Sequence, residues 1–362
     1  MNELFGDEAI TLTAGTDTDI AAVTAKIDDL LREAVMTEEN SPGTSVLVVR
    51  NGVTLFRKAS GRADVEARVP NTPTTNFRLA SVSKQFTAMA ILILGERGML
   101  RRSDRLTDFF PGFPAWGGEI TVRDLLVHSS GLPDYEDFVP DNRPAQVKDA
   151  DVLPILSEQG AALFPPGSRF RYSNSAYCLL ALIVENITGQ SFAAFLAENI
   201  FQPLGMTNTV AFAHGVSTVH NRAYGYSPQG AGFARTDQSV TSATLGDGGI
   251  YSSIDDYARW DTALDTDTLV SRATREQIFT PQQTVDTVDT VDTVDRQKQS
   301  YGFGWFIHDE MTPRRLEHDG TTIGFRNYVI RIPQLRQTVL ILMNRNDGKP
   351  KELARKIVAL LR

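Results

Sequence analysis

The amino-acid sequence predicts a mixed α/β (α+β) fold, in which an antiparallel sheet flanked by terminal helices is joined to a mainly helical lobe. Strand-like segments occur near both ends of the chain, whereas the middle has helical spacing interrupted by turns. The chain has 362 residues, of which 41% are hydrophobic and 22% are charged. That length and composition are those of a globular protein with a large core and two lobes.

The first part of the chain is expected to form a helix and a hairpin. Residues 1–18 show no sustained periodicity, so we expect a flexible N-terminus there. A helix is predicted from Asp19 to about Val35, because apolar residues recur at helical spacing. Two strands, 45–49 and 53–60, flank Asn51-Gly52, a dipeptide that favours a tight hairpin turn.

The middle of the chain is predicted to consist of helices separated by turns. Beyond the helix that follows Ser81, the expected helices are 121–128, 149–159, about 176–188, 191–200 and 254–264. Thr121 and Asp124 form an approximate capping box at the start of the first of these. The glycine-rich turn 246–249 lacks the spacing of a nucleotide-binding loop and is interpreted as structural.

The last part of the chain returns to strands. The expected elements are strands 302–308, 315–318, 325–332 and 338–343 and a helix over 349–362. Residues 284–295 repeat Thr-Val-Asp four times and are interpreted as a low-complexity, mobile surface insertion. We therefore expect an α/β domain built from 19–80 and 236–362, a helical lobe over 81–235, and a site in the cleft between them.

Composition excludes several classes of partner and site. The net charge is −8 and no basic stripe occurs, which argues against a nucleic-acid partner. The single cysteine, Cys178, excludes an internal disulfide and a cysteine-based metal cluster. The N-terminus has no basic, apolar leader and no segment is apolar enough to span a bilayer, so we expect a cytoplasmic protein without a membrane partner. The sequence does not indicate the oligomeric state.

Ser81 and Lys84 stand three residues apart at the head of an apolar run. On a helix they share one face, and the free N–H groups of a first turn favour an oxyanion. A buried lysine with a lowered pKa is able to take the serine proton. The alternative is that Ser81 is only an N-cap and Lys84 a solvated residue, since so short a pattern arises by chance about once in a chain of this length. The apolar residues that follow favour a buried helix.

A second segment supplies other groups that a serine hydrolase needs. The Tyr172 phenol is placed to relay a proton between Ser81 and a leaving group, and the Asn174 amide to orient Lys84 or a substrate carbonyl. Read alone, the pair is equally an ordinary loop tyrosine and turn asparagine.

A third segment, His318 to Thr321, lies at the end of a predicted strand. Gly320 would let a substrate backbone approach closely, and the Thr321 N–H would then be a second oxyanion donor. A histidine near a strand end is otherwise a packed or surface residue. Tyr135, in the middle of the chain, is expected at the rim of the cleft.

Taken in order, the three segments 81–84, 172–174 and 318–320 resemble the three motifs of the penicillin-recognising serine hydrolases, the group of class C β-lactamases, DD-peptidases and family VIII esterases. The resemblance extends over about residues 43–347 and includes the stretches 125–132, 164–167, 203–206 and 248–249. It implies a β-lactamase/transpeptidase-like fold.

The resemblance also implies a mechanism. Ser81 attacks an ester or amide carbonyl and forms an acyl-enzyme, which water then hydrolyses. Lys84 and Tyr172 share the general-base and general-acid roles, and which of them takes the Ser81 proton stays open. The N–H groups of Ser81 and Thr321 hold the oxyanion, Asn174 orients the site, and no metal or organic cofactor takes part.

His318 departs from the resemblance, because most β-lactamases of this group carry lysine there. A histidine is mostly neutral at pH 7, so we expect weak anchoring of substrate carboxylates unless Arg326 or another arginine compensates. The first hypothesis is therefore a cytoplasmic serine esterase or amidase acting on small esters, amides or peptides. The second is a D-amino-acid peptidase, DD-carboxypeptidase or weak β-lactamase. The third is a binding or sensor protein that is acylated but does not turn over.

Overall fold

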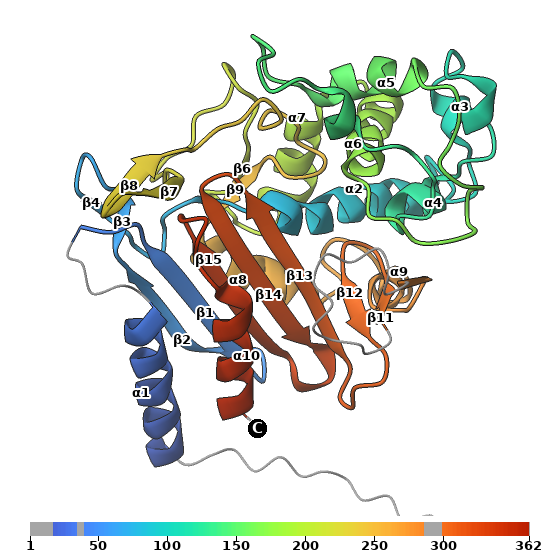
Figure 1. Cartoon of the computed structure of the whole chain (residues 1–362). Helices are drawn as coiled ribbons and strands as arrows, with labels where there is room; N and C mark the ends of the chain where they lie inside the picture. Colours follow the sequence, from blue (N-terminus) through green and yellow to red (C-terminus); the bar gives the residue numbers. More distant parts are fainter. Residues whose placement is uncertain (1–16, 35–39, 286–298, 362) are drawn as a thin grey trace, which may run out of the picture.

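The computed structural model describes residues 17–34, 40–285 and 299–361. Its central feature is an eight-stranded antiparallel sheet in the order β10-β11-β12-β13-β14-β15-β1-β2 (Figure 1). These strands are β1 (Thr44–Arg50), β2 (Val53–Ser60), β10 (Gln283–Val285), β11 (Gln299–Tyr301), β12 (Phe306–His308), β13 (Arg315–Thr322), β14 (Phe325–Ile332) and β15 (Gln337–Met343). Because β1 pairs with β15, segments from the two ends of the chain form one continuous sheet.

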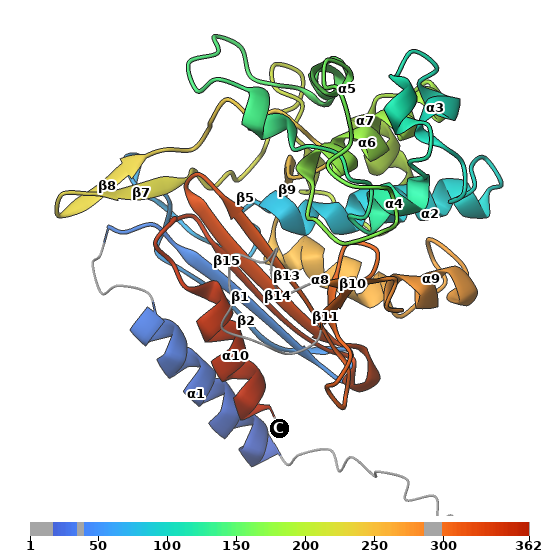
Figure 2. The ribbon, with the colours of Figure 1, turned by 45° about the vertical axis from the view of Figure 1, so that its right-hand side comes forward.

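Two terminal helices cover one face of this sheet. α1 (Asp17–Ala34) and α10 (Pro350–Leu360) lie side by side over the strands in Figures 1 and 2. Side chains alternate along β1, so Val46 and Val48 face these helices whereas Leu47 and Val49 belong to the larger core on the other side. The sheet is therefore buried on both faces.

The helical part packs against the opposite side of the sheet (Figure 2). Its longest helices are α2 (Lys84–Glu96) and α6 (Asn174–Thr188), which pack on each other and are apolar almost all round. The remaining helices are α3 (Leu106–Phe109), α4 (Val122–Leu126), α5 (Asp149–Ser157), α7 (Phe192–Leu196), α8 (Ile254–Ala263) and α9 (Arg272–Ile278), with the single turns η1 (Ala80–Ser83), η2 (Ala115–Gly117), η3 (Tyr135–Phe138), η4 (Ala197–Phe201) and η5 (Pro333–Leu335).

Three small sheets complete the described part of the fold. They are formed by β3 (Arg62–Asp64) with β4 (Val69–Pro70), by β7 (Tyr226–Gln229) with β8 (Gly232–Arg235), and by β5 (Phe77–Arg78), β9 (Ile250–Ser252) and β6 (Val210–Ala211). The last sheet matters for the site, because β5 leads directly into the turn that carries Ser81.

The expected elements are largely present, with one clear error. The Asn51-Gly52 hairpin forms with both residues at positive φ, and β14 has the bounds that the sequence predicts. The single strand expected over 302–308 is wrong: the Gly302 N–H bonds the Trp305 carbonyl at 2.8 Å, and Gly304 adopts φ 79. This tight turn joins β11 to β12. Its buried apolar side chains give the sequence the same apolar pattern as a strand.

Some expectations fall outside what the structure describes. Residues 1–16 of the flexible N-terminus proposed for 1–18 and most of the 284–295 repeat lie outside the described residues, and α1 begins at Asp17, two residues inside that proposed segment. The exact division into 19–80 with 236–362 and 81–235 stays a prediction. Among the described residues, no single helix is long and apolar enough to cross a membrane; α6 with the 192–201 stretch passes that test only as a pair bent by 82°.

Candidate active site

Ser81 lies in a single 3-10 turn, η1, between β5 and α2. The residue before it, Ala80, has φ 50, a left-handed conformation that is uncommon for a residue with a side chain. Such strain persists only where surrounding structure enforces it, and it is frequent at functional sites. Ser81 remains partly exposed whereas Lys84, at the start of α2, is completely buried. The turn therefore presents a hydroxyl to solvent above a buried amine.

The Lys84 amine forms its hydrogen bonds with neutral groups. Its hydrogen-bond partners are Ser81 Oγ at 3.1 Å, Asn174 Oδ1 at 2.8 Å and the Asp247 carbonyl oxygen at 2.9 Å. Burial lowers the pKa of Lys84, while the nearby Asp247 carboxylate opposes that shift. A neutral amine has two N–H donors and one lone pair, so two carbonyl oxygens and one hydroxyl donor match its bonding capacity. In that form the lone pair faces the Ser81 hydroxyl.

Tyr172 lies over the same amine. Lys84 Nζ is 4.9 Å from the centre of the Tyr172 ring. The Tyr172 hydroxyl is buried and has no well-formed hydrogen bond among the described residues. Burial raises its pKa well above the ordinary value, although proximity to Ser81 acts in the opposite direction. The raised pKa favours the neutral phenol form of Tyr172.

Asn174 is fixed by the start of α6. Ser173 is the N-cap, and its Oγ accepts a hydrogen bond from the Ala176 N–H at 3.1 Å. The Asn174 N–H donates to Asp134 Oδ2 at 3.2 Å. With its backbone held in this way, the Asn174 side chain presents its carbonyl oxygen to Lys84. The structure thus brings Ser81, Lys84 and Asn174 into direct contact.

His318 lies on β13 with both ring nitrogens engaged. Nδ1 donates to the Asp319 carbonyl at 2.7 Å, and Nε2 accepts from the Tyr301 hydroxyl at 3.0 Å. Burial lowers the pKa of His318 to about 4, so the ring is neutral at pH 7. Arg326 bonds the carbonyl oxygens of Thr322 and Phe325 within its own hairpin. This geometry agrees with the expectation that His318 is a poor anchor for a carboxylate.

The requirement for glycine at position 320 has a different physical cause from the expected approach of a substrate. A Cβ at this position would lie 2.2 Å from the Leu79 carbonyl oxygen, so the space is filled by the protein's own backbone, not left open to a substrate. The close approach locks β13 against the segment that leads to Ser81. Thr321 follows Gly320 and pairs with Arg326 on β14; its role as an oxyanion donor stays a prediction.

Three neighbouring residues were missed or misplaced by sequence reasoning. The 246–249 turn is more than structural, because the Asp247 carbonyl bonds Lys84, a contact for which a sequence has no signal. Tyr135 is completely buried, with its hydroxyl 3.2 Å from Thr244 Oγ1, so its placement at a rim is wrong. His128 packs its ring 4.3 Å from that of Tyr172.

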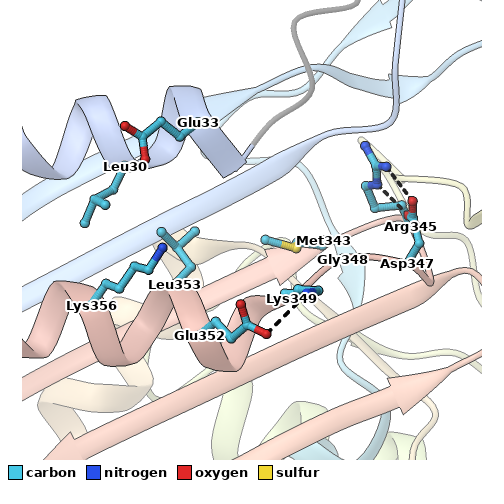
Figure 3. A pocket seen from close by; sticks show the side chains of 10 residues that line it. All are labelled: Leu30, Glu33, Met343, Arg345, Asp347, Gly348, Lys349, Glu352, Leu353 and Lys356. Carbon is cyan, nitrogen blue, oxygen red and sulfur yellow. Dashed lines mark hydrogen bonds and ion pairs between the residues drawn. The ribbon is translucent and has the colours of Figure 1, made fainter.

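A surface pocket of about 400 Å³ lies elsewhere, between α1 and α10 (Figure 3). None of the predicted site residues lines it. Four of its charged groups form local ion pairs, Lys349–Glu352 and Arg345–Asp347, which are drawn in the figure. No group of three or more metal-ligating side chains occurs in the described part of the chain.

Known proteins resemble this chain in both sequence and fold. Residues 27–362 match the family model described as Beta-lactamase. The chain is 31% identical over 337 residues to penicillin-binding protein 4* of Bacillus subtilis, covering 88% of this chain and 71% of that protein. It is 27% identical, with a TM-score of 0.78, to the structure of the octameric penicillin-binding protein homologue from Pyrococcus abyssi, covering 95% of this chain and 77% of that one.

A third likeness concerns the fold alone. The structure of D-amino acid amidase from Ochrobactrum anthropi SV3 superposes with a TM-score of 0.78 at 21% identity, covering 95% of this chain and 98% of that one. The antiparallel sheet with its helical part is thus a β-lactamase/transpeptidase-like fold, as the sequence predicts. The chain belongs to the β-lactamase family, within the penicillin-recognising serine hydrolases.

Proposed function

We propose that this protein hydrolyses small ester or amide substrates through an acyl-enzyme on Ser81. The observation that carries the proposal is the buried Lys84 amine, whose partners are all neutral and one of which is the Ser81 hydroxyl. An amine in that setting gives up its own proton more readily and is free to accept the serine's.

In the acylation step, neutral Lys84 Nζ takes the Ser81 proton as Oγ forms a bond to the substrate carbonyl carbon. The backbone N–H groups of Ser81 and Thr321 hold the oxyanion that develops. The Tyr172 hydroxyl donates its proton to the leaving group as the carbonyl–leaving-group bond breaks, and it recovers a proton from the Lys84 ammonium. Water then attacks the acyl-enzyme with Lys84 again as base, which restores Ser81.

Substrates without a carboxylate fit this site best. His318 is neutral and both of its ring nitrogens are occupied, so it supplies neither a charge nor a free donor. Two acidic residues, Asp134 and Glu136, lie near Lys84, and burial raises the pKa of Glu136 to about 7. The negative charge that these carboxyls carry above their raised pKa values disfavours a second anion at the site.

The names of the similar proteins favour a second candidate. The Bacillus subtilis and Pyrococcus abyssi relatives are a penicillin-binding protein and a homologue of one. A D-amino-acid peptidase, DD-carboxypeptidase or weak β-lactamase activity is therefore the alternative. A protein that is acylated without turnover is the next. Small-molecule substrates and a cytoplasmic location belong to our proposal in each case.

Hydrolysis of short-chain p-nitrophenyl esters tests the first function. The wild type should turn over, and Ser81→Ala should abolish turnover. Ser83→Ala is the matched control, because its hydroxyl lies on the same turn but accepts a hydrogen bond from the Ile250 N–H at 3.3 Å. Equal rates in the wild type and Ser81→Ala would reject the proposal. Faster cleavage of nitrocefin or D-alanyl peptides than of esters would favour the second candidate, and a lasting mass adduct on Ser81 without product the third.

A further inference from the structure

His128 occupies an unusual position next to the site. It follows α4 and is completely buried, and its φ of 58 is left-handed, as at Ala80. Two hydrogen bonds tie it to the segment that carries Tyr172: the Arg171 N–H bonds the His128 carbonyl at 2.8 Å, and the Ser173 N–H bonds His128 Nδ1 at 3.1 Å. The backbone on both sides of Tyr172 is therefore held by one residue.

The imidazole ring also contacts the side chain between those two bonds. Its centre is 4.3 Å from that of the Tyr172 ring, at an interplanar angle of 31°. On its other sides lie Tyr177, at 5.0 Å, and Tyr301, at 4.6 Å. Tyr172 has no well-formed hydrogen bond of its own hydroxyl to fix its orientation, so packing against neighbouring rings must set it.

Packing alone does not explain a histidine here. Because Nδ1 accepts the Ser173 N–H, the ring proton resides on Nε2. Nε2 is buried and has no hydrogen-bond partner among the described residues, a cost that an apolar ring would avoid. The combination of a strained backbone, an unpaired donor and an acceptor for the Tyr172 segment indicates a role in the site.

We propose that His128 is a positioning residue for Tyr172, holding the phenol over Lys84 and beside Ser81 by two backbone hydrogen bonds and one ring contact. The inference rests on the proton-relay role proposed for Tyr172. It assigns to His128 no contact with the substrate.

The surroundings of His128 favour one protonation state of its ring. Burial lowers the pKa of His128 well below its ordinary value, and the neighbouring Lys84 and His318 act in the same direction. This shift favours the neutral ring, in which Nδ1 is an acceptor. The pH dependence of kcat should accordingly follow Lys84, and loss of His128 should lower the plateau of the profile without shifting it.

Two substitutions separate the two contacts of the His128 side chain, the Nδ1 hydrogen bond and the ring packing. His128→Asn keeps an acceptor in the place of Nδ1 and tolerates positive φ, but it lacks the ring. His128→Phe keeps a ring but lacks the acceptor. We expect kcat for ester hydrolysis to fall in both variants, by about 10²-fold in His128→Phe, as a displacement of about 1 Å would produce. KM should change less than about twofold, because an interaction made only in the transition state is lost.

A double-mutant cycle with Tyr172→Phe gives the decisive readout. If His128 acts through Tyr172, either His128 variant should slow the Tyr172→Phe enzyme no further. The matched control is His308→Asn, which alters another buried histidine, on β12, that pairs with Glu317; its kcat should equal that of the wild type.

The outcomes are distinguishable. Wild-type kcat in His128→Asn and His128→Phe, or effects that multiply with Tyr172→Phe, would overturn the inference while Ser81→Ala is still inactive. Activity retained in Ser81→Ala would instead reject the proposed function. Should His128→Phe fail to fold, His128→Asn alone decides by the same criteria.

Discussion

Two completely buried cations, Lys84 and Arg331, lie in different surroundings. Arg331, on β14, is held by the carboxylates of Asp261 and Asp265 on and just after α8 and by the Thr338 hydroxyl at 3.3 Å. Burial tends to lower the pKa of Arg331, but the two carboxylates outweigh it and raise that pKa. Lys84 is held by a hydroxyl and two carbonyl oxygens, and its pKa is lowered.

The difference distinguishes a charge that stabilises the fold from a group that is able to exchange a proton. A buried cation with two carboxylates is compensated, so it keeps its proton and joins β14 to α8. A buried cation with neutral partners is destabilised, and it relieves that destabilisation by losing a proton. Lys84 is therefore suited to acid–base chemistry and Arg331 is not, although both are buried to the same degree.

The largest expected effect is on activity at position 84. Lys84→Arg keeps the positive charge but cannot release a proton, and Lys84→Met removes both. We expect kcat to fall in both variants by about 10²–10⁴-fold, the usual contribution of a general base. Steady-state ester hydrolysis measures this, with thermal unfolding to verify that each variant is folded. Substantial activity in Lys84→Arg would show that the charge matters and the proton does not.

Removing the other cation should affect stability instead. Arg331→Met removes the cation from the buried Asp261 and leaves the partly buried Asp265 with Arg336 alone, so we expect the free energy of unfolding to fall by about 3–5 kcal/mol. Urea denaturation measures the loss, while kcat per folded molecule should be unchanged. Arg336→Met is the control: Arg336 pairs with the same Asp265 at 3.3 Å but is half exposed, so we expect a loss below about 1 kcal/mol. Equal losses in the two variants would contradict the comparison.

His318 extends the comparison to a buried group that is neutral at pH 7. Its folded pKa of about 4 is below the unfolded value of about 6.5, so between these pH values the unfolded chain binds more protons. The contribution of His318 to the free energy of unfolding is therefore complete above pH 6.5. It is lost as the pH falls toward 4, by up to about 3 kcal/mol. In His318→Gln this part of the acid dependence should disappear. Urea denaturation at several pH values between 4 and 6.5 measures the slope of the free energy of unfolding against pH. The same slope in the wild type and in His318→Gln would be evidence against a neutral buried ring.

A smaller effect than that of Arg331→Met is expected from exchanging the cation type at position 331. In Arg331→Lys the charge remains, but a single ammonium cannot bridge Asp261 and Asp265 as the guanidinium fork does. Loss of one charged hydrogen bond should cost about 1.5–3 kcal/mol in the free energy of unfolding, less than Arg331→Met. A loss as large as in Arg331→Met would indicate that geometry rather than charge dominates this site.

Local patterns predicted much of this molecule. The Asn51-Gly52 turn, the cap at Thr121 and the apolar runs of α2 and α6 follow from neighbouring residues, and the structure contains all of them. The grouping of Ser81, Lys84 and Asn174 was also predictable, because the three motifs occur in order.

The remaining features depend on contacts between distant segments. The Asp247 carbonyl reaches Lys84 across 163 positions, and a backbone atom has no sequence signature. Gly320 is explained by the Leu79 carbonyl, which only the packing of β13 brings near. The 302–305 turn was mistaken for a strand because burial of Phe303 and Trp305 imposes the same apolar pattern as a sheet.

The central claim is that Lys84 is a buried amine poised to lose its proton. Titration of the protein labelled with ¹³C at the lysine Cε, followed by NMR, measures this directly, and the resonance missing from Lys84→Arg assigns the signal. We predict that Lys84 titrates below the ordinary lysine value of about 10.4. A Lys84 midpoint at or above about 10.4 would contradict the account.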